Sequence, residues 1–202
     1  MFDILLNKDE RGIRDEVRVF VRDKVDRNLV LAMDSKEKEY PYEFIKAAAK
    51  ENLLGLRFPK DFGGRGLGWV SEMAALEEIG VLGIALGCAF SLPSIVGEAI
   101  NKFGTPEQKK QYLLPTLQGK KICGEGLTEP RGGSDFFGTN TTAVKYGDSF
   151  VVNGEKRFVA GGVGADYFLV YAKTNFKAPP HQSLSAFLID RDMGVKVEEE
   201  YE

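Results

Sequence analysis

The sequence predicts an α+β chain, with an all-helical first part and a strand-rich second part. Apolar residues recur at helical spacing up to residue 119, as at Ile13 and Val17. After Gly119 the pattern changes to short runs rich in β-branched and aromatic residues, separated by turns that contain glycine. We therefore predict an all-α domain over residues 1–119 and a β domain over residues 120–202.

The composition is that of an ordinary globular protein, and it argues against several classes of function. The chain has a net charge of −3 and no basic stripe interleaved with aromatic residues, so we expect no nucleic-acid partner. No apolar run approaches the length of a membrane span and no signal peptide is recognisable, so we expect a cytoplasmic protein without a membrane span.

Metal and histidine chemistry are also not expected. The single histidine, His181, lies in a Pro-rich loop, so we expect no Ser-His-Asp arrangement. A zinc site needs several Cys or His ligands, so we predict no metal site. Cys88 and Cys123 lie in apolar surroundings and are expected to be buried thiols in a reducing compartment.

Two helix starts in the first part carry clear capping signals. Asn7 followed by Glu10 is a variant of the capping box. Thr105 is followed by Pro106 at the first helical position and by Gln108 at the third, which is typical of a helix start.

Between these caps, the pattern predicts further helices. One begins at Pro41, another is capped by Ser71, and a closely packed apolar helix or helix end over residues 80–90 precedes a separate helix over residues 93–103. Residues 59–67 form a glycine-rich loop.

The second part is predicted to be an incomplete antiparallel, β-barrel-like domain. Gly147-Asp148 joins two strands, and Asn153-Gly154 is typical of a hairpin turn that leads into a returning strand. We predict strands over residues 122–127, 141–146, 149–152, 156–160, 166–173 and 184–190.

The stretch over residues 121–135 is the candidate site. A short strand bounded by glycines is consistent with close approach to something flat, and a Gly/Ser turn follows it. Such a turn exposes backbone N–H groups that can hold an anion or the polar edge of a ring system. The hydroxyls of Thr128 and Ser134 add adjustable hydrogen-bonding groups. The alternative is a strand followed by an ordinary surface turn.

Five segments, in order along the chain, resemble sequence signatures of the acyl-CoA dehydrogenases, which are flavin enzymes. The segments are P-K-D-F-G-G-R-G-L at 59–67, F-G-T-P-E-Q-K with the following Y-L-L-P and Gly119 at 103–119, L-T-E-P-R-G-G-S-D at 127–135, V-N-G-E-K-R-F-V at 152–159 and A-D-Y-F-L-V at 165–170. The resemblance implies FAD as cofactor and oxidation of an acyl-CoA thioester to the 2,3-enoyl-CoA, with electrons passing to an electron-transfer flavoprotein.

The resemblance also implies a set of site residues. The residues implied to contact the flavin are Glu125, Gly126, Leu127, Thr128, Gly133, Ser134, Phe158, Val159 and Ala160. Ser134 is also implied to reach the CoA portion of the substrate. The main departures from the family pattern are Glu125, which stands where an aromatic residue is usual, and Ala160, which stands where a Thr or Ser is usual. Two milder ones are Gly132 in place of Ala and Gly161 in place of Asn.

Members of this family continue into a C-terminal helical bundle that carries the catalytic carboxylate, and nothing in this sequence matches it. No catalytic residue is therefore assigned here, and the resemblance implies a second chain that supplies the bundle, or a homo-oligomer. Two alternatives remain. One is a flavin-dependent oxidase or monooxygenase on the same scaffold, and the other is a non-catalytic scaffold subunit that has lost the flavin.

Overall fold

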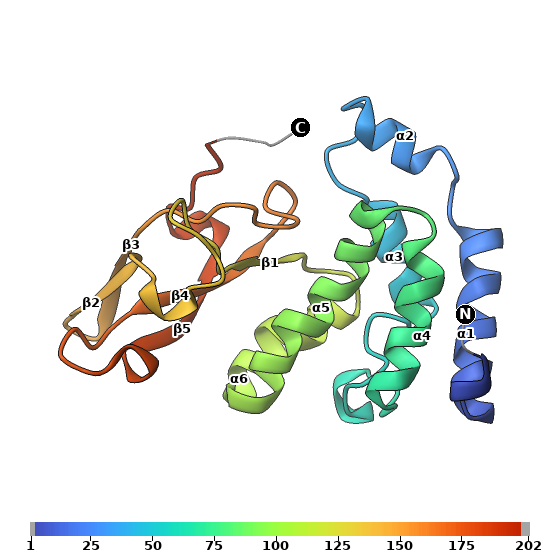
Figure 1. Cartoon of the computed structure of the whole chain (residues 1–202), viewed down its shortest axis with the longest axis horizontal. Helices are drawn as coiled ribbons and strands as arrows, with labels where there is room; N and C mark the ends of the chain where they lie inside the picture. The colour runs from blue at the N-terminus through green and yellow to red at the C-terminus, as the bar shows by residue number, and fades with distance from the viewer. Residues whose placement is uncertain (1–2, 199–202) are drawn as a thin grey trace. The chain divides into compact units, whose positions relative to one another are not determined.

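The computed structural model describes residues 3–198. The chain divides into two compact units, a helical unit that ends at Ile122 and a sheet unit that begins at Cys123 (Figure 1). A helical part followed by a mixed sheet confirms the predicted α+β class.

The helical unit consists of five longer helices and a segmented final helix. The longer helices are α1 Lys8–Lys24, α2 Leu29–Asp34, α3 Tyr42–Lys50, α4 Trp69–Gly80 and α5 Ile84–Phe103. The final helix comprises α6 Pro106–Gln108, the π-helical stretch η3 Lys109–Leu113 and α7 Leu114–Leu117. Short 3₁₀ turns are η1 Asp3–Leu5 and η2 Lys60–Phe62.

Both predicted capping boxes are confirmed. The Asn7 side chain accepts from the Glu10 amide at 3.0 Å, and the Glu10 carboxylate accepts from the Asn7 amide at 2.7 Å. The Thr105 hydroxyl accepts from the Gln108 amide at 3.3 Å, and the Gln108 side chain accepts from the Thr105 amide at 2.9 Å. Each box satisfies amides that a helix start otherwise leaves without a partner.

Two predictions for the helices were wrong, and one helix was missed. Ser71 is not a cap, because α4 begins at Trp69 and Ser71 is buried inside its first turn. The two helices expected over residues 80–103 are one helix, α5, which continues through Pro93. Helix α2 was not predicted, and a single buried residue, Leu29, anchors it. In each case burial against the rest of the unit outweighs the local signal.

Helix α5 forms the centre of the helical unit. Its Gly97 faces Phe58, and a Cβ added there would lie 2.8 Å from the ring and 3.0 Å from Leu113. The 20 residues of α5 are long and apolar enough for a membrane span, contrary to the prediction that no run approaches that length. However, 56% of its most apolar window is buried, as expected of a core helix.

A buried polar network also joins α4 and α5 to the loop after α3. The Arg57 guanidinium bonds the Glu72 carboxylate at 3.1 Å, the Ser94 hydroxyl at 2.6 Å and the Glu98 carboxylate at 3.0 Å. It also lies 3.3 Å from the centre of the Trp69 ring. Since each partner comes from a different turn of α4 or α5, Arg57 fixes how these helices pack.

The sheet unit contains five strands. They are β1 Cys123–Gly126, β2 Thr142–Tyr146, β3 Ser149–Asn153, β4 Tyr167–Lys173 and β5 Leu184–Asp190. Short 3₁₀ turns are η4 Phe136–Gly138, η5 Pro180–Gln182 and η6 Arg191–Met193.

The sheet is mixed, which corrects the antiparallel pairing that we predicted. Strand β4 pairs in parallel with β1, from Cys123 opposite Tyr167 to Gly126 opposite Val170. It pairs antiparallel with β5 along its whole length, and β2 joins its end through a parallel pair with Lys173. Parallel pairing is available to β1 and β4 because a long segment of chain separates them.

The β2–β3 hairpin is confirmed, and the second predicted hairpin is wrong. Gly147, in the left-handed region at φ 60°, makes the turn between β2 and β3. No strand forms over residues 156–160. Gly154 instead allows its backbone to pass close to Thr141, because a Cβ there would lie 2.3 Å from the Thr141 hydroxyl oxygen.

Candidate functional site

The site is built on the turn that follows β1. The backbones of Glu129 and Gly132 exchange hydrogen bonds of 3.2 and 2.9 Å, which closes the turn. Gly132 has φ 142°, a conformation that favours glycine. At Gly133, a Cβ would lie 2.8 Å from the Thr128 hydroxyl oxygen, so this hydroxyl and the Gly133 backbone are direct neighbours. The turn thus brings Thr128 and Gly133 together.

Glu129 is the centre of a buried hydrogen-bond network and is 3% exposed. Its Oε1 accepts from the Thr141 hydroxyl at 2.6 Å, the Thr141 amide at 2.8 Å and the Thr139 hydroxyl. Its Oε2 accepts from the Asn140 amide at 2.5 Å. Burial raises the pKa of Glu129, but these donors outweigh it and hold the pKa well below its usual value. The carboxylate therefore stays ionised and ties the turn to residues 139–141.

Lys156, which lies 27 residues after Glu129 in the sequence, completes this network. Its ammonium lies 3.0 Å from Glu129 Oε1, 3.1 Å from the Thr139 hydroxyl and 3.3 Å from the carbonyl oxygen of Leu127. Its side chain is 9% exposed. Burial lowers the pKa of Lys156 below its usual value and outweighs the opposing effect of the Glu129 charge.

The segment after Lys156 runs alongside the turn. The Arg157 amide donates to the Thr128 carbonyl at 2.8 Å. Phe158 follows in the left-handed region at φ 53° with 69% of its surface exposed. Val159 lies against β1, 3.3 Å from where a Cβ of Gly124 would be. The structure therefore brings residues 158–160 next to residues 124–128, although some 30 residues of sequence lie between them.

Arg191 fixes the loop that follows Ala160. Its guanidinium donates to the carbonyl of Ala165 at 2.7 Å, to that of Val163 at 2.7 Å and to that of Gly162. No role was predicted from the sequence for Arg191 or for Lys156. Lys156 lies within the V-N-G-E-K-R-F-V signature at 152–159, whereas no local sequence pattern marks Arg191.

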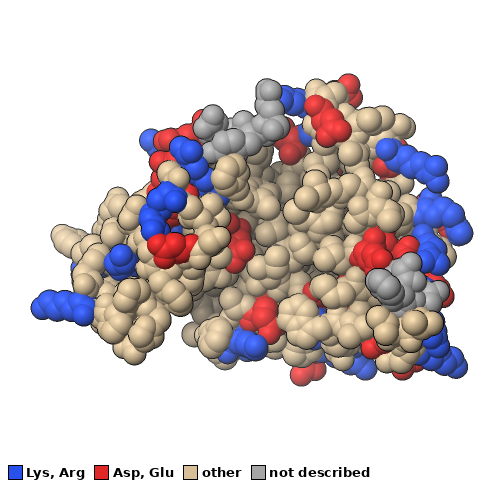
Figure 2. Space-filling model, viewed as in Figure 1, with Lys and Arg blue, Asp and Glu red and all other residues tan. Residues whose placement is uncertain are grey.

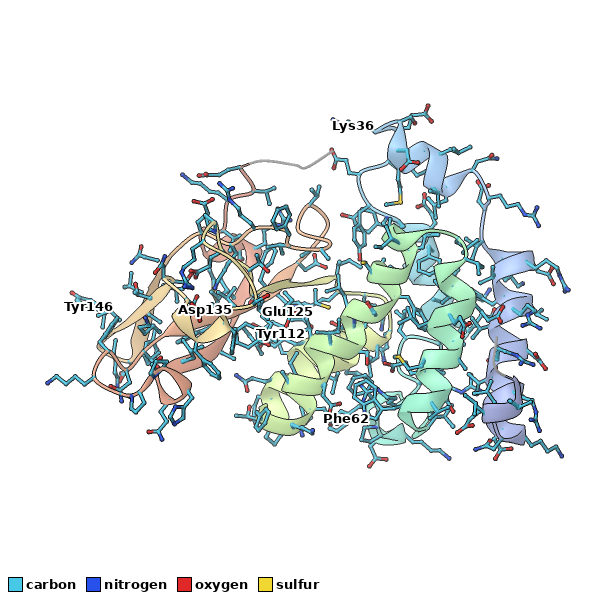
Figure 3. The ribbon with its side chains drawn as sticks, viewed as in Figure 1. Lys36, Phe62, Tyr112, Glu125, Asp135 and Tyr146 are labelled. Atoms are coloured by element: carbon cyan, nitrogen blue, oxygen red, sulfur yellow. The ribbon has the colours of Figure 1, made fainter. Side chains whose placement is uncertain are left out.

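Glu125 points to the other face of β1. Successive side chains of a strand alternate between faces. A Cβ at Gly126 would lie 3.2 Å from Lys156, whereas the Glu125 carboxylate accepts from the Tyr171 hydroxyl at 3.1 Å. Burial, followed by the Glu125 charge, raises the pKa of Tyr171. Figure 3 labels Glu125 on β1, and the ring of Phe136 packs edge-on to Tyr171 at 5.1 Å. The Glu125 carboxylate therefore has a hydrogen-bond donor within the sheet.

The fit to a ring-shaped cofactor rests on the turn rather than on the glycines of β1. Gly124 and Gly126 make room for Phe168 and Lys156, so the flat neighbour expected there is the chain itself. By contrast, the hydroxyls of Thr128 and Ser134 form no hydrogen bond with other groups within residues 3–198. They remain available to a ligand beside the Gly133 backbone.

Residues 3–198 contain no group of three or more His, Cys, Asp or Glu side chains that could hold a metal ion. Burial raises the pKa of Cys123 to about 12, whereas Cys88 is exposed, contrary to our expectation. On the face shown in Figure 2, Lys and Arg side chains (blue) are interspersed with Asp and Glu side chains (red).

Both parts of the chain match domains of one known family. Residues 7–120 match the acyl-CoA dehydrogenase N-terminal domain, and residues 124–202 match the acyl-CoA dehydrogenase middle domain. The chain belongs to the acyl-CoA dehydrogenase family. Its two units correspond to two successive domains of that family.

Several family members are similar over nearly the whole chain. The short-chain-specific acyl-CoA dehydrogenase of Clostridium acetobutylicum is 35% identical over 94% of this chain and 49% of its own length. Subunit CarC of the caffeyl-CoA reductase-Etf complex of Acetobacterium woodii is 35% identical over 86% of this chain and 47% of its own. The chain thus spans about half the length of these relatives.

A solved structure shows the same fold. The glutaryl-CoA dehydrogenase of Mycobacterium smegmatis in complex with FADH2 superimposes with a TM-score of 0.84. It is 30% identical and covers 95% of this chain and 47% of its own.

Proposed function

We propose that this chain forms the flavin-facing part of an FAD-dependent acyl-CoA dehydrogenase that converts an acyl-CoA thioester to the 2,3-enoyl-CoA. The observation that carries the proposal is the pairing of the Thr128–Gly133 turn with residues 158–160. The Arg157 amide makes this connection through its 2.8 Å bond to Thr128. The FADH2 complex of the related glutaryl-CoA dehydrogenase supports it.

Each residue has a proposed role. FAD, when bound, accepts the hydride that leaves the substrate. The amides of Leu127 and Thr128 and the Thr128 hydroxyl bind the polar edge of the ring, where donors stabilise the charge of the reduced form. Phe158, whose ring is largely exposed, packs against the ring system. Ser134 reaches the CoA portion of the substrate.

No catalytic base is assigned within this chain. Glu129 is occupied by the network that holds the turn, and Glu125 is paired with Tyr171. The chain spans about half of its relatives' length, so we place the base and the acyl pocket in the other half. That half belongs either to the same protein or to a second polypeptide. An electron-transfer flavoprotein is the proposed acceptor, as the name of the Acetobacterium relative suggests.

Titration of the 202-residue chain with FAD, followed by flavin fluorescence, tests the flavin assignment. Thr128→Val and Phe158→Ala are expected to weaken binding, whereas Ser149→Ala, on the exposed strand β3, leaves it unchanged. If the chain binds no FAD, with or without a polypeptide that carries the other half, the flavin proposal fails and a scaffold role is favoured.

An activity assay of the same chain tests the assignment of the base. We expect no turnover of an acyl-CoA with an artificial acceptor by this chain alone, and turnover once the other half is added. Steady turnover by the chain alone would refute the placement of the base outside it.

A flavin oxidase or monooxygenase is the second candidate. Ala160 provides no hydroxyl where the family pattern has a Thr or Ser, which fits a flavin site retuned toward oxygen. Rapid oxygen consumption by the complete, flavin-loaded protein, without any electron-transfer flavoprotein, would favour this candidate over the dehydrogenase.

A further inference from the structure

The ammonium of Lys156 lies behind the peptide that is expected to face the ring. It donates to the carbonyl oxygen of Leu127 at 3.3 Å. The same peptide unit carries the N–H of Thr128, because the carbonyl of one residue and the amide of the next share a conjugated plane. A cation on the carbonyl end therefore polarises the whole unit and makes the Thr128 amide a stronger donor.

The ammonium is held in this position. Its side chain is 9% exposed, and Glu129 and Thr139 take its other hydrogen bonds at 3.0 and 3.1 Å. The Glu129 carboxylate is itself fixed by Thr141 and by the Asn140 amide. Moving Lys156 toward water would leave a buried carboxylate without its cation, which is costly.

Lys156 also adjoins the second half of the site. Its neighbour Arg157 donates its amide to the Thr128 carbonyl, and Phe158 follows directly. Lys156 is therefore linked to both sides of Thr128. Its ammonium bonds the carbonyl of the preceding residue, Leu127, and its neighbour Arg157 bonds the carbonyl of Thr128 itself. Other charged side chains nearby are engaged elsewhere. Arg157 pairs with Glu155 at the exposed surface, and Glu125 lies on the opposite face of β1.

We propose that Lys156 is a positioning residue of the flavin site: held by Glu129, it fixes and polarises the Leu127–Thr128 peptide so that the Thr128 amide binds the ring. The inference rests on the proposed function, because the ring is the acceptor. The positioning itself is a property of the flavin-free chain and is measurable there.

The first test uses the flavin-free 202-residue chain and ¹H–¹⁵N NMR. In Lys156→Met we expect the Thr128 amide resonance to move upfield and the Arg157 amide to exchange faster with solvent. Lys156→Arg should restore both, because it keeps a buried cation. Lys145→Met, at an exposed position of β2, is the matched control and should change neither. Thr128 and Arg157 amides that stay as in the wild type in Lys156→Met would overturn the proposal.

The second test is titration of the same variants with FAD. We expect Lys156→Met to bind about tenfold more weakly, the size of one charge-assisted hydrogen bond. If Lys156→Met does not fold, the double variant Glu129→Gln/Lys156→Met serves instead, because it leaves no buried charge unpaired. Affinity that is lost in the double variant and recovered in Lys156→Arg supports polarisation. Equal affinity of the neutral variants and the wild type overturns it.

The two proposals fail in different ways. A wild-type chain that binds no FAD, even with the other half present, refutes the proposed function. In that case the amide measurements still decide whether Lys156 positions Thr128.

Discussion

Replacing Arg57 by Met should strongly destabilise the helical unit. The Arg57 side chain is 7% exposed and bonds Glu72, Ser94 and Glu98. After the substitution, the Glu72 carboxylate, 8% exposed, loses its cation and retains the Ser94 hydroxyl at 2.6 Å. Glu98 is less affected, because Lys102 lies 3.1 Å from it.

The magnitude follows from Glu72. Removing one partner of a buried ion pair typically costs about 3–5 kcal/mol, because the other charge is left buried. Loss of the Trp69 stacking adds about 0.5 kcal/mol, the value for an exposed ring. Arg57→Met should therefore remove roughly 3.5–5.5 kcal/mol of a total that is about 5–15 kcal/mol in ordinary domains. The double variant Arg57→Met/Glu72→Leu should recover most of this loss, since it leaves no charge unpaired at that site.

The assay is urea unfolding followed by the fluorescence of Trp69, the single tryptophan of the chain. Circular dichroism of the helices provides a second probe, because Arg57 itself contacts the indole. Arg65→Met is the matched control: Arg65 pairs with Glu16 at 2.7 Å near the surface, and such pairs contribute about 0–1 kcal/mol. If Arg57→Met costs no more than Arg65→Met, the argument that buried Glu72 depends on its cation is wrong.

Three further predictions concern the sheet unit and the thiols. Because the folded pKa of Glu129 is depressed, its contribution is complete above its unfolded pKa of about 4.3 and is lost as pH falls below that value. Acid unfolding followed by circular dichroism should therefore be less steep in Glu129→Gln, and an unchanged pH profile would contradict this. Ellman's reagent at pH 8 should modify exposed Cys88 rapidly and Cys123 only in denaturant, and two fast thiols would contradict the burial of Cys123. Gly133→Ala places a Cβ 2.8 Å from the Thr128 hydroxyl, so it should weaken FAD binding in a fluorescence titration. Wild-type affinity would show that this contact does not shape the site.

Local signals in the sequence were sufficient for many elements. The capping boxes at Asn7 and Thr105 connect groups three residues apart, so a short window of sequence contains the whole interaction. The β2–β3 hairpin and strand β5 follow from short apolar runs and a glycine turn. The family signature likewise marked the turn with Thr128 and Gly133, because its residues are nearly contiguous.

Contacts between distant residues depended on the tertiary structure. Parallel pairing of β1 with β4, the continuity of α5 through Pro93 and the exposure of Cys88 each depend on what packs against them. The pairing of Glu125 with Tyr171 spans 46 residues of sequence, and no local pattern predicts it.

Periodicity, caps and signatures act over a few neighbouring residues, so the α+β class, the family and the position of the turn are all predictable from the sequence. The groups that support that turn come together through contacts between distant parts of the chain. Glu129 meets Lys156 across 27 residues, and Arg191 reaches the loop at Ala165 across 26. A hydrogen bond between such residues forms only in the folded chain, because bringing them together costs conformational entropy that a local pattern does not offset.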